Sequence, residues 1–569
     1  MGDQSLYRNT TGFLNNAFGY QAMQNNTTGF YNEAFGVSAM NNNVTGTDNT
    51  AMGHSVMFQN TGSRNTGFGE AANQQNVNGN GNSALGYRAL QGANGSPSFS
   101  YSTGVGDSAA WSNTASGVTA IGAFALQDNT SGTYNAAIGY KADLTNTTGT
   151  NNTSVGATAM NGLTTGSHNL ALGYEAMNSQ IWGVTNTGSY NIGIGEQAMA
   201  DITTGVHNIG IGEQALWDLD AGRDNVAVGD SALENVNSAT ANNNTGVGVG
   251  AGFDVTTGAN DVAVGYYAQC NFANNNLSGN DNVAVGAYAQ AWLTTGSNNT
   301  AVGHEAMYGN GLVTGGNNTA IGYFALSGIN SATNNTALGY NSLSATSSGG
   351  NNVGIGYQAL STNTTGTNNT ALGYQANVST TALTNATAIG NGALVSASNT
   401  MVFGNASITD NYFTGNVHAS CGILACSDIR YKKEIKIIPS VLNDLMKVQA
   451  VNYYFKTAEE LKDQRIVSSA FHGTDGKEKQ IGFIAQQVEP IFKDVVHTDE
   501  EGYKSIDYSR LTPILTKAIQ EQQHMIDSLK AENNSMKAEN STMKADLSSQ
   551  KAEIEKIKEY LQIEAKVSK

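Results

Sequence analysis

The chain of 569 residues contains 67 Gly, 4 Pro and 3 Cys, has a net charge of −17 and carries charge on only 12% of its residues. Collagen is excluded because its triple helix needs Gly at every third position and abundant Pro, and three cysteines are too few to staple a chain of this length. The acidic balance argues against nucleic-acid binding, and no apolar run reaches the roughly 18 residues that predict a membrane span.

Charge is divided unevenly along the chain. Residues 1–426 hold five basic and 21 acidic residues, a net charge of −16, whereas residues 427–569 hold 22 basic and 23 acidic residues, a net charge of −1. Three of the four prolines also lie in the second segment. The composition therefore predicts two physically different bodies joined near residue 425.

An internal repeat fills the first body. The string Asn-x-Ala-φ-Gly-Tyr-x-Ala-φ, where φ is an apolar residue, recurs, for example as NNAFGYQAM (15–23) and NTALGYNSL (335–343). Aligned on the central glycine, it gives 22 copies from Gly19 to Gly390, most often 17 residues apart and ranging from 16 to 22. Repeats of helical hairpins need about 33 residues or more, so this spacing excludes them.

Seventeen residues suit one coil of a β-solenoid. The alternation of small and apolar residues in the string has the period of a strand, and the Thr-Thr-Gly-x-x-Asn segment that follows, as in 364–369, is typical of a turn. We therefore expect strand, corner, strand and corner in each coil, stacked about 4.8 Å apart over roughly 100 Å. One Asn per coil is expected to stack into a ladder of side-chain amides.

Two features of the repeat bear on binding. The long insertions (91–102, 178–190 and 270–281) fall at one point of the coil, between the second apolar residue and the Thr-Gly turn, which suits either free drift in loop length or a binding face. Nine coils place Tyr after the central glycine, and we interpret this row as packing rather than as a platform for sugars. The scattered histidines lack metal-ligand spacing, so no metal or other cofactor is expected.

The repeat also predicts association between subunits. Both the Ala/Gly face and the φ face of the coil are apolar, and one narrow coil has little volume for a core, so we expect neighbouring subunits to cover one face. The repeats resemble the head repeats of trimeric autotransporter adhesins, which share the Ala-φ-Gly core but are shorter. They are also similar to the shafts of phage and virus tail fibres. The resemblance implies a trimeric β-roll.

The second body differs in kind. Strand-like runs at Ala450–Phe455, Gln480–Ile484 and Tyr503–Ile506 mix with helix-like runs, which predicts a small α+β unit. Three motifs stand in it, SDIRYK (427–432), GFIAQQV (482–488) and YSRLTPIL (508–515). Together they resemble the chaperone-of-endosialidase family, which comprises C-terminal intramolecular chaperones of phage tailspikes and fibres.

That resemblance implies a domain that trimerises the upstream β-structure and then cuts itself off, in cis, with a Ser–Lys dyad. Carried onto this sequence, the nucleophile is Ser427, the dyad lysine is Lys432 and the scissile bond is Cys426–Ser427, with Lys433 as the alternative lysine. The chemistry is sound because a serine hydroxyl needs a base, and lysine serves as one only when burial lowers its pKa. We expect that pocket to form in the assembled trimer. No activity in trans is evident.

The tail repeats every seven residues from 530, as KAENNSM, KAENSTM, KADLSSQ and KAEIEKI. A seven-residue apolar repeat predicts a left-handed coiled coil, here over 515–569. A trimer follows from the family resemblance and not from the core residues themselves. The core positions are Ile519, Ile526, Asn533, Asn540, Leu547, Ile554 and Leu561 (a) and Leu515, Gln522, Leu529, Met536, Met543, Gln550 and Ile557 (d).

The predicted fold is mostly β, a trimeric parallel β-solenoid followed by a small α+β chaperone domain and a trimeric coiled coil. The predicted segments are a solenoid shaft (1–404), a junction with the cleavage site (405–426), a chaperone and auto-peptidase domain (427–514) and a coiled coil (515–569).

This organisation predicts a homotrimeric tail fibre or spike of a virion, assembled in the host cytoplasm and used for host attachment. Its expected partners are other virion tail proteins and a host surface receptor, either a glycan or a protein. A bacterial surface adhesin is the main alternative, although neither a secretory signal nor a membrane anchor is visible. A polysaccharide-degrading tailspike and an ice-binding solenoid are further alternatives.

Overall fold

The computed structural model describes residues 2–93, 97–179, 185–236, 238–271, 277–309, 311–409, 411, 429–456, 479–498 and 502–567. They fall into two compact units, Met1–Thr409 and Asp410–Lys569. Two residues of the predicted cleavage site, Cys426 and Ser427, lie outside the described residues.

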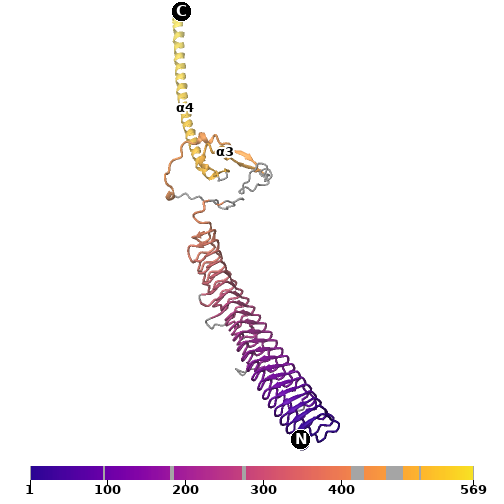
Figure 1. The fold of residues 1–569 in the computed structure, drawn as a ribbon. Helices are drawn as coiled ribbons and strands as arrows, with labels where there is room; N and C mark the ends of the chain where they lie inside the picture. Colours follow the sequence, from indigo (N-terminus) through magenta and orange to yellow (C-terminus); the bar gives the residue numbers. More distant parts are fainter. Residues whose placement is uncertain are drawn as a thin grey trace. The chain divides into compact units, whose positions relative to one another are not determined.

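The first unit is a parallel β-solenoid of coils of about 17 residues (Figure 1), which confirms the predicted mostly-β fold. Its described residues form one sheet of 23 short strands, each paired in parallel with the strand of the next coil. The strands are β1 Asn16–Phe18, β2 Glu33–Phe35, β3 Thr50–Met52, β4 Thr66–Phe68, β5 Ser83–Leu85, β6 Thr103–Val105, β7 Thr119–Ile121, β8 Ala136–Ile138, β9 Thr153–Val155, β10 Leu170–Leu172, β11 Ile192–Ile194, β12 Ile209–Ile211, β13 Val226–Val228, β14 Thr245–Val247, β15 Val262–Val264, β16 Val283–Val285, β17 Thr300–Val302, β18 Thr319–Ile321, β19 Thr336–Leu338, β20 Val353–Ile355, β21 Thr370–Leu372, β23 Thr387–Ile389 and β25 Met401–Phe403.

The second side of the coil differs from the prediction of two strands per coil. Left-handed backbone alternates along it, for example at Gln21 (φ 56°) and Met23 (φ 50°). Hydrogen bonds between coils nevertheless persist, since the Met23 amide donates to the carbonyl of Ala39 at 2.9 Å. This side is therefore bonded like a sheet without being extended. Near the end of the stack it does become extended, where β22 (Asn377–Val378) pairs with β24 (Leu394–Val395).

The central glycine of each repeat is required by both conformation and space. At Gly212, φ is +136°, in the region that side chains disfavour, and a Cβ would lie 2.3 Å from the carbonyl oxygen of Gly229 in the next coil. The same contact recurs between successive central glycines, for example from Gly19 to Gly36. Glycine is therefore what allows the coils to stack this closely.

The interior of the coil combines one small and one long apolar side chain. The middle residue of the strand, such as Ala34, and the residue four positions after the central glycine, such as Met23 or Leu216, are fully buried. Each buried Met or Leu side chain contributes roughly 1.5–3 kcal/mol of hydrophobic free energy. Because this pair repeats in coil after coil, the interior forms two long clusters rather than a compact core.

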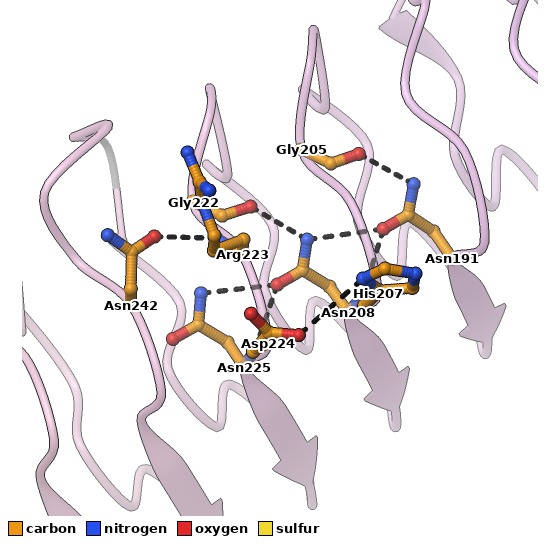
Figure 2. Close-up of polar contacts among 9 residues, drawn as sticks. All are labelled: Asn191, Gly205, His207, Asn208, Gly222, Arg223, Asp224, Asn225 and Asn242. Carbon is orange, nitrogen blue, oxygen red and sulfur yellow. Dashed lines mark hydrogen bonds and ion pairs between the residues drawn. The ribbon is translucent and has the colours of Figure 1, made fainter.

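The predicted ladder of Asn side chains is present (Figure 2). Nδ2 of Asn208 donates to Oδ1 of Asn191 at 3.1 Å and to the carbonyl of Gly222 at 2.8 Å. Oδ1 of Asn208 in turn accepts the backbone N–H of Asn225 at 3.0 Å. Each buried amide thus satisfies polar groups of two neighbouring coils.

The outward face of the sheet carries a continuous apolar stripe, defined by the last residue of each strand. No member of the stripe is charged or polar, and many members are exposed, from Phe18 (48%) at one end to Leu372 (47%) near the other. The stripe comprises Phe18, Phe35, Met52, Phe68, Leu85, Val105, Ile121, Ile138, Val155, Leu172, Ile194, Ile211, Val228, Val247, Val264, Val285, Val302, Ile321, Leu338, Ile355, Leu372, Ile389 and Phe403.

The second unit is small and mixed, as predicted. Two antiparallel strand pairs and several short helices pack around Val488, Val495 and Leu511. The elements are η2 Ile429–Tyr431, α1 Leu442–Leu445, β26 Val451–Tyr453 (paired with β27 Gln480–Gly482), α3 Ala485–Val488, η3 Lys493–Val495, β28 Val496–Thr498 (paired with β29 Lys504–Ile506) and α4 Tyr508–Val567.

One continuous helix, α4, begins at Tyr508 in the 508–515 motif and holds the whole seven-residue repeat of the predicted coiled coil. Its heptad core residues are uncovered in the single chain; Ile519 is 64% exposed, Leu529 63% and Met543 67%. Among the described residues, no helix has the length and apolarity needed to cross a bilayer.

Candidate self-cleavage domain and binding surfaces

The predicted dyad lysine lies directly after the short helix η2. The backbone N–H of Lys432 donates to the carbonyl of Ile429 at 3.0 Å, which closes the turn, and the side chains of Lys432 and Lys433 are both exposed. Because Cys426 and Ser427 fall outside the described residues, the geometry of the predicted dyad is not defined.

Apolar side chains beside these lysines are also uncovered. Ile429 is 71% exposed, Ile435 64% and Ile437 90%. Isoleucine side chains at this exposure leave most of their favourable burial energy unused. An exposed apolar segment of this kind is typical of a surface that another chain buries. Burial of the segment would also remove water from Lys432.

Two of the three motifs that carry the family resemblance meet in space. The backbone N–H of Phe483 donates to the hydroxyl of Tyr508 at 3.2 Å, and their rings stack with centroids 6.0 Å apart. A Cβ at Gly482 would lie 2.6 Å from the Tyr508 hydroxyl oxygen. The glycine of the 482–488 motif is thus explained by the tyrosine of the 508–515 motif.

A carboxylate on α4 secures the segment that follows the lysines. Glu521 accepts the N–H of Leu442 at 2.9 Å, the N–H of Val441 at 3.2 Å and the hydroxyl of Ser440 at 3.0 Å, which caps α1 across 79 residues of sequence. The hydrogen bond from Leu442 is the main cause that lowers the pKa of Glu521 below its ordinary value. Nothing in the sequence pattern identified this contact, because Glu521 sits in an ordinary helical run.

The start of α4 is fixed in a similar way. Oδ1 of Asp507 accepts the N–H of Ser509 at 3.0 Å, and Nε of Arg510 pairs with Oδ2 of Asp507 at 3.1 Å. The hydrogen bond from the Ser509 hydroxyl is the main cause that lowers the pKa of Asp507. An acceptor at this position is a typical N-cap, and it could have been recognised in the sequence as Asp-Tyr-Ser-Arg.

A pocket of about 530 Å³ lies in this unit between the segment 438–444 and the helices η3 and α4. Pro439, Phe492 and Ile514 give it apolar walls, and Asp444, Lys493, Asp494 and Arg510 give it charged ones. Neither Lys432 nor Lys433 is among its lining residues, so it is separate from the predicted dyad.

On the solenoid, the row of tyrosines forms a real stack. Tyr323, Tyr340, Tyr357 and Tyr374 follow one another with ring centroids 5.0–5.4 Å apart and ring planes within 9°. Each ring is 40–51% exposed. Packing between tyrosines is therefore present, while the outer part of each ring is free to meet a partner.

The histidines of the solenoid pair with neighbouring coils. Nδ1 of His207 lies 3.6 Å from a carboxylate oxygen of Asp224 in the next coil (Figure 2), and the ring of His168 stacks on Tyr190. Within the described residues, no three His, Cys, Asp or Glu side chains are grouped as a metal ion would require.

Comparison with known families decides the nature of the second unit. Residues 427–497 match the family model described as chaperone of endosialidase. Over these residues the chain is similar to a chaperone-of-endosialidase domain. Domains of this family are self-cleaving intramolecular chaperones found in phage tail proteins, and a match to such a domain behind a long β-solenoid fits a tail fibre or tailspike. No curated protein matches the chain.

Proposed function

We propose that the chain is the subunit of a homotrimeric tail fibre or tailspike for host attachment. In this proposal its chaperone-of-endosialidase domain directs the solenoids to assemble and then releases itself by cleavage of the Cys426–Ser427 bond. The observation that carries the proposal is the junction of such a domain to a solenoid with an uncovered apolar stripe.

The apolar stripe supports assembly with copies of the same chain. Soluble monomers rarely expose apolar patches beyond a few hundred Å², whereas the stripe runs over 23 strands, about 105 Å at the spacing of paired strands. A partner must match it in length, in period and in lack of charge. A parallel copy in the same register does so at every coil.

Helix α4 supports the same assembly at the other end of the chain. Its heptad residues Ile526, Leu529 and Leu547 are 40–63% exposed in the single chain. A helix of 60 residues that shows its apolar seam to water is stabilised by packing that seam against other helices. We therefore propose a coiled coil over 515–569.

Cleavage follows from the proposed dyad in two steps. The Ser427 hydroxyl adds to the Cys426 carbonyl carbon while the Lys432 amine takes its proton, and the peptide nitrogen leaves with a proton to give an ester. Water then hydrolyses the ester, which leaves a carboxylate on Cys426 and a free amino group on Ser427. Lys432 can act only when it is neutral, and partner subunits that cover Ile435 and Ile437 would supply the dry surroundings that favour neutral lysine.

The test is to express the wild-type chain and the Ser427→Ala variant and to measure the mass and oligomeric state of each. We expect the wild type to yield a trimeric product that ends at Cys426, and the variant to remain a trimer of intact chains. Lys432→Met should block cleavage, whereas Lys433→Met should not. An intact wild-type chain would refute self-cleavage, and a monomeric product would refute the trimeric fibre.

A further inference from the structure

The solenoid holds a pocket of about 350 Å³ beside the first long insertion, at the lower end of the range for ligand sites, about 300–1,000 Å³. We call it the Trp111 pocket. Its walls include Gln75, Arg88, Gln91, Gly92, Trp111 and Ser112. It lies on the part of the coil where the insertions occur, which is not the part that carries the apolar stripe.

The pocket exists because two successive coils carry small residues at a position where the preceding coils carry long ones. At the sixth position after the central glycine, preceding coils carry Gln59 and Gln75, whereas the next two carry Gly92 and Ser112. Gly92 has φ +87°, and a Cβ there would lie 2.8 Å from Cγ of Pro97 in the insertion. The loop thus excludes any larger residue at Gly92 and keeps the space open.

The wall formed by Trp111 is held in place by a relay of amides. The indole N–H of Trp111 donates to Oε1 of Gln91, and Nε2 of Gln91 donates to Oε1 of Gln74 at 2.7 Å. The insertion itself is anchored by Phe99, which is fully buried. The aromatic wall is therefore preorganised, which reduces the entropy lost when a ligand binds.

Arg88 supplies positive charge that no carboxylate neutralises in the described part of the chain. Its guanidinium carbon lies 4.9 Å from the ring centroid of Tyr87 and 5.9 Å from that of Trp111. It forms no ion pair with any carboxylate in the described part of the chain, and none of the described residues lining the pocket is Asp or Glu. Arg88 is one of only five basic residues in 1–426, so a guanidinium with aromatic neighbours and no carboxylate partner is an exception on an acidic solenoid.

We propose that the Trp111 pocket binds a saccharide that carries a carboxylate, such as a uronic acid. The guanidinium matches a carboxylate in a bidentate hydrogen bond. The indole offers an apolar face to the C–H side of a sugar ring, and the amide of Gln91 and the hydroxyl of Ser112 match sugar hydroxyls. The biological use of the site rests on the proposed attachment function, since it would be a receptor contact.

The test titrates the protein purified after expression of the full-length chain, whether cleaved or intact, with D-glucuronate and with D-glucose and follows binding by saturation-transfer NMR. We expect glucuronate to bind at least about 10-fold more tightly than glucose, as a charge-assisted pair predicts. Arg88→Gln should remove this preference, and Trp111→Gln should remove binding of both sugars. Gln is structurally acceptable at both positions, because Gln197 and Gln214 hold the same left-handed backbone as Arg88, and Gln91 and Gln127 stand where Trp111 does in neighbouring coils.

Arg64→Gln is the matched control, because Arg64 is an exposed solenoid arginine with φ 58° that does not line the pocket. It should bind glucuronate like the wild type. Equal binding of glucuronate by the wild type and Arg88→Gln, competition by inorganic phosphate at the same concentration, or no saturable binding would each overturn the inference. Because the assay needs neither virions nor cells, its failure would leave the proposed trimerisation and self-cleavage intact.

Discussion

Replacing Asp261 by Asn should stabilise the solenoid at neutral and alkaline pH. Asp261 occupies the position of the Asn ladder, where its Oδ1 accepts the N–H of Asn282 at 2.8 Å. Its Oδ2 is buried without a hydrogen-bond partner, at the point where Asn208 in another coil donates through its amide nitrogen (Figure 2). A carboxyl group can donate there only when it is protonated.

Burial raises the pKa of Asp261 from 3.8 to about 7, against the hydrogen bond from the backbone N–H of Asn282, which lowers it. The folded chain thus binds this proton more tightly than the unfolded chain. Folding stability therefore falls as the pH rises from about 4 to about 7 and changes no further above that. The loss reaches roughly 4 kcal/mol, at about 1.4 kcal/mol for each pKa unit.

Asp261→Asn should remove this loss, because an amide donates at every pH. Guanidinium unfolding of both chains at equal concentration, followed by circular dichroism, should give a large difference above about pH 8 and a small one below about pH 4. Asp48→Asn is the control, since Asp48 is an exposed aspartate of the solenoid in a distant coil; it should behave like the wild type. Equal pH dependence of the wild type and Asp261→Asn would refute the reasoning.

Two further predictions concern the packing of each unit. Gly212→Ala should destabilise the solenoid by more than about 2 kcal/mol, since its Cβ meets a carbonyl oxygen at 2.3 Å and its φ is +136°. Gly210→Ala should cost less, because Gly210 has no left-handed φ, its Cβ would meet the Ala215 carbonyl oxygen at the longer distance of 2.9 Å, and the next coil carries Ala227 at that strand position; equal thermal stability of the two variants would contradict this account. Glu521→Gln should increase hydrogen exchange at Leu442 by roughly 10-fold, with Glu532→Gln as control. The pKa of Glu521 is lowered in the folded chain. In the wild type, protection of the Leu442 amide from exchange should therefore be present above the ordinary pKa of 4.5 and be lost as the pH falls through the lower folded value. Protection of Leu442 that survives acid would exclude a role for the Glu521 carboxylate.

The period of the sequence was enough to predict the stacked sheet and its amide ladder, because each depends on one residue type recurring in each coil. The prediction of an extended strand on the second side of the coil was wrong, because the side chain of Met23 gives no indication of its left-handed backbone. A further coil with β25 was missed because Thr400 replaces the ladder Asn and Gly404 follows Gly390 after only 14 residues.

Less of the candidate functional sites than of the fold could be predicted from the sequence. Motifs carried by a family resemblance identified the domain that the family model matches, but the dyad of Ser427 and Lys432 stays a prediction. Contacts between distant segments, such as that of Glu521 with Leu442, depend on tertiary packing and leave no local signature. The Trp111 pocket likewise arises from Gly92 and Trp111 meeting across two coils, which becomes evident only when the coils are aligned in space.

The close stacking of central glycines has a consequence for how such a chain changes over generations. A coil touches only the coils before and after it, so whole units can be gained or lost without disturbing the rest. Each in-frame unit of about 17 residues would lengthen or shorten the solenoid by about 4.8 Å while keeping the apolar stripe and the amide ladder in register. Loop insertions leave that stacking unchanged, so the reach of the molecule and the surfaces it displays can evolve separately.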